Sequence, residues 1–215
     1  MVFDEIHQLR DPARLLKIGA DAFPKFKILA TGSSTLGASK KFRDTLTGRK
    51  RTIHLVPVLW EELAAFGVTL NDRLFHGGLP PALLADAKNP AFYREWMDSF
   101  FARGWDPLRP GDFGVLWEHF VLEHLQAHFP DTPVRYWRDK AQREIDFVLA
   151  HRRDVVDVIE CKWDPAGFDV GSLRVFRGYY PKGRNYLVTP SGDPAYTRRF
   201  GTLEVRVCTP TELHA

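Results

Sequence analysis

Cysteine is scarce in this sequence, and several other common features are missing. The 215 residues include two cysteines, Cys161 and Cys208, which are far apart and fit no metal-binding spacing. We therefore expect no disulfide framework, and we expect the protein to lie in the reducing cytoplasm. No stretch reaches the apolar length of a membrane span, so we expect no membrane contact. The acidic residues Asp4 and Glu5 near the N-terminus do not fit a signal peptide.

Net charge is also small. The formal charge is +3, and much of the basic excess falls in residues 40–43 and 49–51. The small positive charge weakly favours polyanionic partners such as nucleic acid. Internal repeats and low-complexity tracts are absent, and the apolar fraction of 44% is ordinary for a globular protein. The length allows one large domain or two small ones.

The strongest functional pattern lies in the second half of the chain. Two β-rich runs, 144–150 and 155–163, flank a polar tetrad and predict a hairpin. In the second run Glu160 and Lys162 are two residues apart, so their side chains leave the same face of the strand. Asp146 would lie opposite Glu160 only if the loop has an odd length or contains a bulge, because a one-residue slip turns the side chain to the other face.

These side chains, with Glu118 on a preceding predicted helix, are typical of a metal-dependent phosphodiester site. Two carboxylates in a partly dry place repel each other unless a cation or a proton lies between them, and Mg²⁺ or Mn²⁺ prefers oxygen ligands. Lys162 could stabilise charge on the phosphorane or orient the attacking water, and the carbonyl of Cys161 could complete the coordination. The simpler interpretation is that all four side chains are surface charges at strand and helix ends.

The helix glutamate, Asp146 and the Glu160-x-Lys162 pattern resemble the PD-(D/E)xK nuclease superfamily. The expected elements follow in that superfamily's order: helix 113–129, strand 134–138, the hairpin, a helix at about 170–179 and strand 185–189. The resemblance implies that Asp146, Glu160 and Lys162 are catalytic, that Glu118, Asp146 and Glu160 hold the metal, and that DNA is the partner. Such a fold can also retain its residues and serve as a binding platform.

The first part of the chain carries a second pattern. A short apolar strand followed by Asp4 and Glu5 has the form of a Walker B motif, which holds Mg²⁺ and polarises water at a nucleotide. The expected elements after it are a helix at 11–22 and strands at 26–31 and 52–56. Residues 31–34 form a polar turn at the carboxyl end of a strand, where ligands bind in open α/β sheets. Residues 4–7 also fit a helicase motif, but no partner helicase motif follows.

Residues 2–63 are similar to AAA-type P-loop ATPases of bacteria and archaea that carry a C-terminal nuclease-like domain. Residues 74–80 and 143–148 match the same family, so the resemblance covers nearly all of the chain. It implies that Asp4 and Glu5 are the Walker B pair, that Ser33 is a sensor of the γ-phosphate, and that Arg49 is a candidate arginine finger acting on a neighbouring subunit.

Two parts of that family's pattern are missing. No Gly-rich phosphate loop ending in Gly-Lys-Ser/Thr occurs in the sequence, so most triphosphate contacts are absent. We predict little ATP hydrolysis by this chain alone, and ATP binding only if a separate chain supplies the phosphate loop. Only residues 82–104 stand where the family places a winged-helix-like segment. We expect a shortened family member, whose exposed sheet edge favours a homodimer or docking onto that separate chain.

The predicted architecture is α/β, with a partial P-loop ATPase parallel sheet at 1–80, a helical linker at 81–106 and a restriction-endonuclease-like core at 107–215. The main functional hypothesis is a Mg²⁺- or Mn²⁺-dependent nuclease-like protein fused to an ATPase remnant and acting on DNA phosphodiesters. The alternative is an ATPase-family protein whose C-terminal domain is a non-catalytic binding module, active only with a partner that supplies the phosphate loop.

Five further side chains have two interpretations each. His124 and His128 are four residues apart on a predicted helix, a spacing that can bind zinc. Without a third ligand the pattern is more typical of a polar helix face. Arg138, Lys140 and Arg143 precede the strand of Asp146 and could contact phosphates, or they could be solvated charges at the end of a strand.

Overall fold

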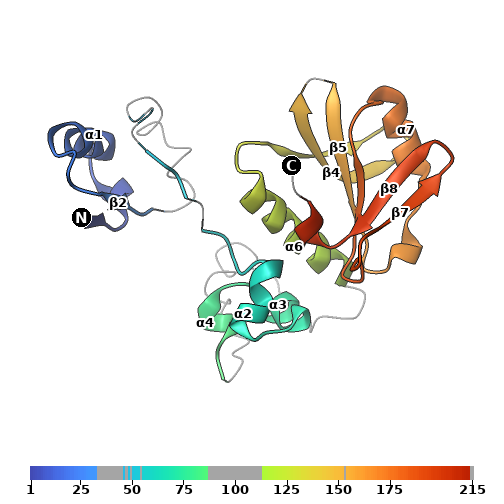
Figure 1. Ribbon diagram of the computed structural model, residues 1–215, viewed down its shortest axis with the longest axis horizontal. Coiled ribbons are helices and arrows are strands. Elements are labelled where there is room, and N and C mark those ends of the chain that lie inside the picture. Colours follow the sequence, from blue (N-terminus) through green and yellow to red (C-terminus); the bar gives the residue numbers. More distant parts are fainter. Residues whose placement is uncertain are drawn as a thin grey trace. The chain divides into compact units, whose positions relative to one another are not determined.

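The computed structural model describes residues 1–32, 46, 48, 50–53, 55–86, 113–152 and 154–213. The chain divides into two units, residues 1–54 and residues 55–215 (Figure 1). Ser33, Arg49 and most of the predicted linker at 81–106 lie outside the described residues. Within the described part the fold is mixed α/β, with both parallel and antiparallel strand pairs.

The first unit contains a pair of short parallel strands. Its elements are β1 (Val2–Phe3), η1 (Ile6–Gln8), α1 (Pro12–Ala22) and β2 (Leu29–Ala30). Asp11 caps α1, because its side chain accepts a hydrogen bond from the backbone N–H of Arg14 at 3.0 Å. Ile6 and Leu46 are the buried residues at the centre of this unit.

The predictions for this unit are partly confirmed. The helix expected at 11–22 is present as α1, and the strand expected at 26–31 is present only as β2. The strand expected at 52–56 is wrong for the described residues of that range, which form no strand. Ile53 and Leu55 are 70% and 95% exposed, so their apolar character does not reflect burial in a sheet.

The second unit is built on a six-stranded sheet with the strand order β3-β4-β5-β6-β8-β7. Its strands are β3 (Val134–Arg138), β4 (Glu144–Arg152), β5 (Val155–Cys161), β6 (Asn185–Val188), β7 (Tyr196–Phe200) and β8 (Leu203–Cys208). β6 pairs in parallel with both β5 and β8, and the other pairs are antiparallel. The strands predicted at 134–138 and 185–189 are confirmed, whereas the hairpin of β7 and β8 was not predicted.

Two helices cover the two faces of this sheet (Figure 1). α6 (Phe113–His128) packs Trp117 and other residues against Ile159 of β5, whereas α7 (Gly171–Tyr179) packs Phe176 into the cluster that contains Val158. Because neighbouring residues of a strand point to opposite faces, the two helices lie on opposite sides. Both helices were predicted, at 113–129 and at about 170–179, and each begins and ends within about one residue of the expected positions.

A small helical segment precedes the sheet. It consists of η4 (Trp60–Glu62), α2 (Leu63–Phe66), α3 (Leu70–His76) and α4 (Pro80–Leu83). The buried side chain of Arg73 joins this segment to α6, because its Nε donates to the carbonyl of Val58 at 2.7 Å and its guanidinium pairs with Glu123. The structure therefore places residues 55–86 in the same unit as the sheet.

None of the helices in the described residues combines the length and the apolar character needed to cross a membrane.

Candidate functional site

The hairpin of β4 and β5 has the register that the sequence analysis required. Phe147 pairs with Ile159 and Ala150 with Val156, but Arg152 pairs with Val155, which marks a one-residue bulge near the turn. Continuing the register past the first pair sets Asp146 opposite Glu160. The bulge supplies the one-residue shift without which the two carboxylates would point to opposite faces.

Lys162 lies within ion-pair distance of both Asp146 and Glu160. The ammonium of Lys162 is 3.4 Å from Asp146 Oδ2 and 3.6 Å from Glu160 Oε2. The backbone N–H of Cys161 also donates to Asp146 Oδ2 at 2.8 Å, which fixes the orientation of that carboxylate. Lys162 lies just beyond the end of β5, and its own N–H donates to the carbonyl of Val188 at 3.1 Å, so its backbone is held by the sheet.

Glu160 holds a proton more tightly than an ordinary glutamate. Its pKa is raised to about 8, first because the side chain is buried and then because the charge of Asp146 is close, while Lys162 lowers it in part. Opposing effects act on Lys162, where burial lowers the pKa but the two carboxylates raise it overall. At neutral pH Glu160 therefore keeps its proton, beside the ammonium of Lys162.

Glu118 is near this group but does not complete a three-carboxylate set. Burial raises the pKa of Glu118, and the charge of Asp146 raises it further, whereas Lys162 lowers it. Among the described residues, a single trio of potential metal-binding side chains has all its ligand atoms within 4.8 Å of one another, and it consists of Glu61, His124 and His128. The three predicted metal ligands Glu118, Asp146 and Glu160 thus do not meet that distance.

The first unit brings Asp4 to the carboxyl ends of its two parallel strands. The Thr31 hydroxyl, just after β2, donates a hydrogen bond to the carboxylate of Asp4. The same hydroxyl accepts from the backbone N–H of Glu5 at 3.2 Å, and the carbonyl of Thr31 accepts from Ile6 N–H at 3.0 Å. Glu5 has a φ of 48°, a left-handed backbone that is uncommon for a non-glycine residue. Thr31, which the sequence analysis treated only as the start of a turn, orients the predicted magnesium ligand.

Two of the basic residues before β4 are held by local contacts. Arg143 pairs with Asp139 at 2.6 Å, and Arg138 donates to the side-chain oxygen of Gln142. The hydrogen bonds of Arg143 lower the pKa of Asp139. These contacts favour a role for the two arginines in shaping the turn between β3 and β4. Lys140 is exposed within the same turn.

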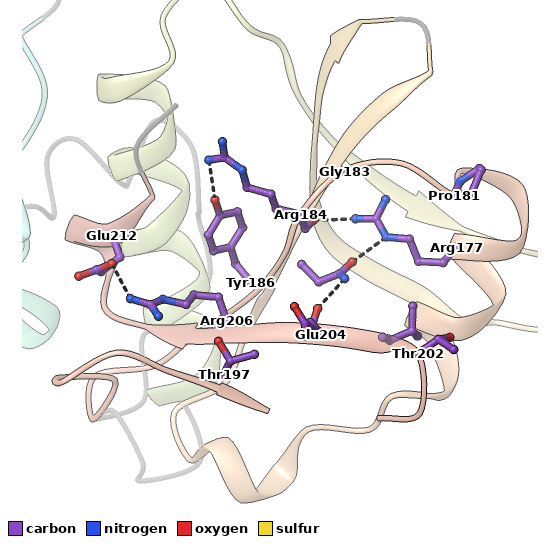
Figure 2. A pocket seen from close by; sticks show the side chains of 12 residues that line it. Arg177, Pro181, Gly183, Arg184, Tyr186, Thr197, Thr202, Glu204, Arg206 and Glu212 are labelled. Atoms are coloured by element: carbon purple, nitrogen blue, oxygen red, sulfur yellow. Dashed lines mark hydrogen bonds and ion pairs between the residues drawn. The ribbon is translucent and has the colours of Figure 1, made fainter. Parts of the chain in front are cut away.

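A cleft of about 590 Å³ beside β6 and β8 was not found by the sequence analysis (Figure 2). Arg177, Arg184 and Arg206 line it, together with polar residues of the strands. Each guanidinium already has a partner: Arg177 donates to Asn185 at 2.6 Å, Arg184 to the Tyr186 hydroxyl and Arg206 to Glu212, both at 3.3 Å. No motif marks this cleft, because its residues come from separate segments.

Two family models match separate parts of the chain. Residues 1–64 match the family model described as an AAA domain, and residues 113–206 match a domain of unknown function, DUF4143. None of the curated proteins matches the chain.

Among solved structures, a half-complex from a tetradecameric assembly of Thermococcus gammatolerans McrB AAA+ hexamers with bound McrC is similar, at 15% sequence identity and a TM-score of 0.35. The alignment covers 66% of this chain and 47% of that chain, so the chain spans about half of that protein's length. The match at residues 1–64 relates the first part of the chain to AAA domains.

Proposed function

We propose that this protein works as part of an AAA-type ATPase, in which the first unit supplies the magnesium side of the nucleotide site and the C-terminal sheet domain binds a partner. The observation that carries the first half is the contact of Asp4 with Thr31 beyond the carboxyl ends of β1 and β2. Ligands of open α/β sheets bind at such ends. The match of residues 1–64 to the AAA domain supports the same assignment.

The donor set at this place fits a hydrated Mg²⁺. Asp4 offers a carboxylate and Thr31 a hydroxyl, both oxygen ligands of the kind that Mg²⁺ takes beside nucleotide phosphates. The metal would neutralise charge on the phosphates, and Glu5 would polarise the attacking water. A phosphate loop must come from a separate segment, because the sequence contains no Gly-Lys-Ser/Thr loop.

ATP hydrolysis is therefore expected only after a phosphate-loop segment is added. The chain would be mixed with a fragment of an AAA-type ATPase that ends before its own Walker B strand, and phosphate release would be measured with Mg²⁺. Glu5→Gln should reduce turnover by about 100-fold, the usual effect of losing a general base, and Asp4→Asn should abolish it. Asp21→Asn, an exposed carboxylate on α1, is the control. Turnover by the chain alone, or turnover unchanged in Asp4→Asn, would contradict the proposal.

The partner proposed for the sheet domain is a nucleic acid. The edge strand β3 exposes Arg135 and Tyr136, and the Tyr136 side chain is 77% exposed. Cationic side chains beside an exposed aromatic ring can hold the phosphates and stack on the bases of a single strand.

One observation supports a second candidate, a metal-dependent nuclease with a PD-(D/E)xK-type core. The bulged register places Asp146 opposite Glu160, with Lys162 within 3.6 Å of both. Asp146, Glu160 and the carbonyl of Cys161 would hold Mg²⁺, whose chemistry would be to polarise the phosphodiester and activate a water. Lys162 would then stabilise the developing negative charge.

A cleavage assay distinguishes the two candidates. Supercoiled plasmid and single-stranded DNA would be incubated with the protein and Mg²⁺ or Mn²⁺, and DNA binding would be measured in parallel. Under the nuclease candidate, Lys162→Ala should slow nicking by about 100-fold or more, while Lys182→Ala should not change it, because Lys182 pairs with Asp154 on the surface. If the wild-type protein binds DNA but does not nick it, the nuclease candidate is excluded and the non-catalytic binding domain is supported.

A further inference from the structure

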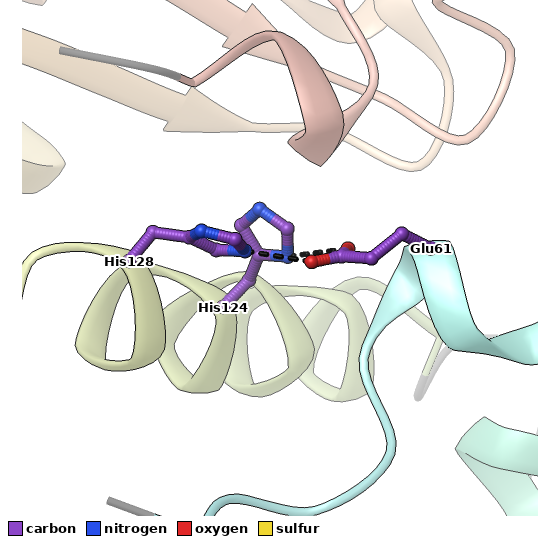
Figure 3. A group of neighbouring side chains, drawn as sticks. All are labelled: Glu61, His124 and His128. Atoms are coloured by element: carbon purple, nitrogen blue, oxygen red, sulfur yellow. Dashed lines mark hydrogen bonds and ion pairs between the residues drawn. The ribbon is translucent and has the colours of Figure 1, made fainter. Parts of the chain in front are cut away.

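A glutamate and two histidines from distant parts of the sequence meet beside α6. Figure 3 shows Glu61 extending from η4 toward His124 and His128, which lie on successive turns of the helix. Glu61 Oε2 is 3.6 Å from His124 Nδ1, and Glu61 Oε1 is 2.7 Å from His128 Nε2. All three ligand atoms lie within 4.8 Å of one another. Glu61 is the third ligand that the histidine spacing lacked.

These separations suit a tetrahedral metal ion. Bonds of about 2.0–2.1 Å to nitrogen and oxygen place neighbouring ligand atoms of such an ion about 3.3 Å apart. The two distances, which start from different oxygens of Glu61, lie on either side of this value, so side-chain rotations would be needed to open the group around an ion. The helix holds the histidines in position, because residues four apart lie on one face, and their ring centroids are 4.3 Å apart.

The three side chains form a group that is buried on one side and open to solvent on the other. The side chain of His124 is fully buried, whereas the side chains of His128 and Glu61 are 30% and 38% exposed. The buried imidazole has a fixed place, and the exposed pair leaves room for a water molecule as a fourth ligand. Two imidazoles and one carboxylate are the ligand types that zinc takes in sites with three protein ligands.

We propose that Glu61, His124 and His128 form a zinc site that fastens η4 to α6. The metal would link the helical segment at 55–86 to the sheet domain through bonds stronger than the present contact of Glu61 with the histidines. This site shares no residue with the Asp4 site or the Asp146 site, so its test is independent of the proposed function.

The test is zinc titration of the whole chain after treatment with a chelator. We expect one Zn²⁺ per chain, and Co²⁺ in its place should give the intense visible absorption of a tetrahedral site. His128→Ala and Glu61→Gln should weaken zinc binding by more than the roughly 100-fold that loss of a hydrogen-bond partner of a metal ligand can cost. Both side chains are partly exposed, so these variants are expected to fold, whereas replacing His124 would disturb the core.

Two control variants locate the ion. His119→Ala removes an exposed histidine of the same helix, and Asp146→Asn removes a ligand of the candidate carboxylate site; both should bind zinc as the wild type does. Zn²⁺ should also raise the melting temperature of the wild type but not of His128→Ala. A wild type that binds no zinc, or binding that survives in His128→Ala and Glu61→Gln, would falsify the proposal. Loss of binding in Asp146→Asn alone would assign the ion to the carboxylate pair and overturn it as well.

Discussion

Replacing Arg177 with lysine is expected to lower the free energy of unfolding of the second unit by about 3 kcal/mol. Arg177 lies on α7 and is 7% exposed. Its guanidinium makes five hydrogen bonds, to the side chain of Asn185 and to the carbonyls of Val156, Tyr180, Lys182 and Arg184. One side chain thus joins the C-terminal end of α7 to β5 and to the segment that enters β6.

The size of the effect follows from what lysine cannot do. A guanidinium presents five donors in a planar fork, whereas an ammonium presents three donors at one point. The carbonyls of Lys182 and Arg184 would keep the backbone N–H groups of Val156 and Val158 as donors, but the carbonyls of Val156 and Tyr180 and the side chain of Asn185 would lose the guanidinium. A buried polar group left without a partner costs about 1–3 kcal/mol. Burial also lowers the pKa of Arg177.

Urea unfolding followed by tryptophan fluorescence would measure this loss. Trp137 is a suitable reporter, because its ring packs edge-on against Phe176 of the same helix at 5.4 Å. Arg174→Lys is the matched control, since Arg174 is exposed on α7. A difference between the two variants of less than about 1 kcal/mol, the size of an ordinary surface effect, would show that the carbonyls find other partners.

The sequence predicts which residues of the candidate site share a face of β5, but it does not predict the strand register that brings Asp146 to them. A period of two along β5 places Glu160 and Lys162 on one face, and the hairpin follows from the apolar runs on either side. Whether Asp146 joins them depends on the bulge between Ala150 and Arg152. A bulge leaves the hydrophobic alternation on both sides intact, so the pattern alone does not determine the register.

Other parts could not be predicted because their contacts join distant segments. Glu61 and His128 are 67 residues apart in sequence, so the third ligand of the histidine pair has no local signal. Arg177 uses backbone carbonyls as acceptors, and every residue type offers those. The hairpin of β7 and β8 was missed because β7 is an edge strand with mostly exposed residues, which lacks an apolar alternation.

The AAA-like part shows a different limit. Asp4 and Glu5 were recognisable from their position after an apolar strand, and the structure places Asp4 beside Thr31. The predicted roles of Ser33 and Arg49 stay predictions, because both lie outside the described residues. The apolar residues at 52–56 predict a strand, although Ile53 and Leu55 are exposed.

Glu160→Gln is expected to remove a large part of the pH dependence of stability between about pH 5 and pH 8. The pKa of Glu160 is about 8 in the folded protein, raised by burial and then by Asp146, against 4.5 for an ordinary glutamate. In this window the folded protein keeps the proton and the unfolded chain releases it. The folded state therefore binds more protons, and wild-type stability falls as pH rises, by up to about 1.4 kcal/mol per pH unit.

Glutamine has the shape of the protonated side chain and no charge to desolvate. The variant should thus match the wild type near pH 5 and exceed it near pH 8, and the difference between the two curves isolates Glu160 from other groups. Glu118, whose pKa is also raised, would leave a smaller slope in the variant.

Denaturant unfolding at half-unit steps of pH measures both curves, with Glu204→Gln, an exposed carboxylate on β8, as the control. If the wild-type curve were as flat as that of Glu160→Gln, the pair would hold no extra proton, and Lys162 alone would balance the charge. A steep wild-type slope that Mg²⁺ abolishes near pH 8 would instead show a cation replacing the proton of Glu160 beside Asp146. That result would favour the nuclease candidate, whereas a slope indifferent to Mg²⁺ would favour the binding module.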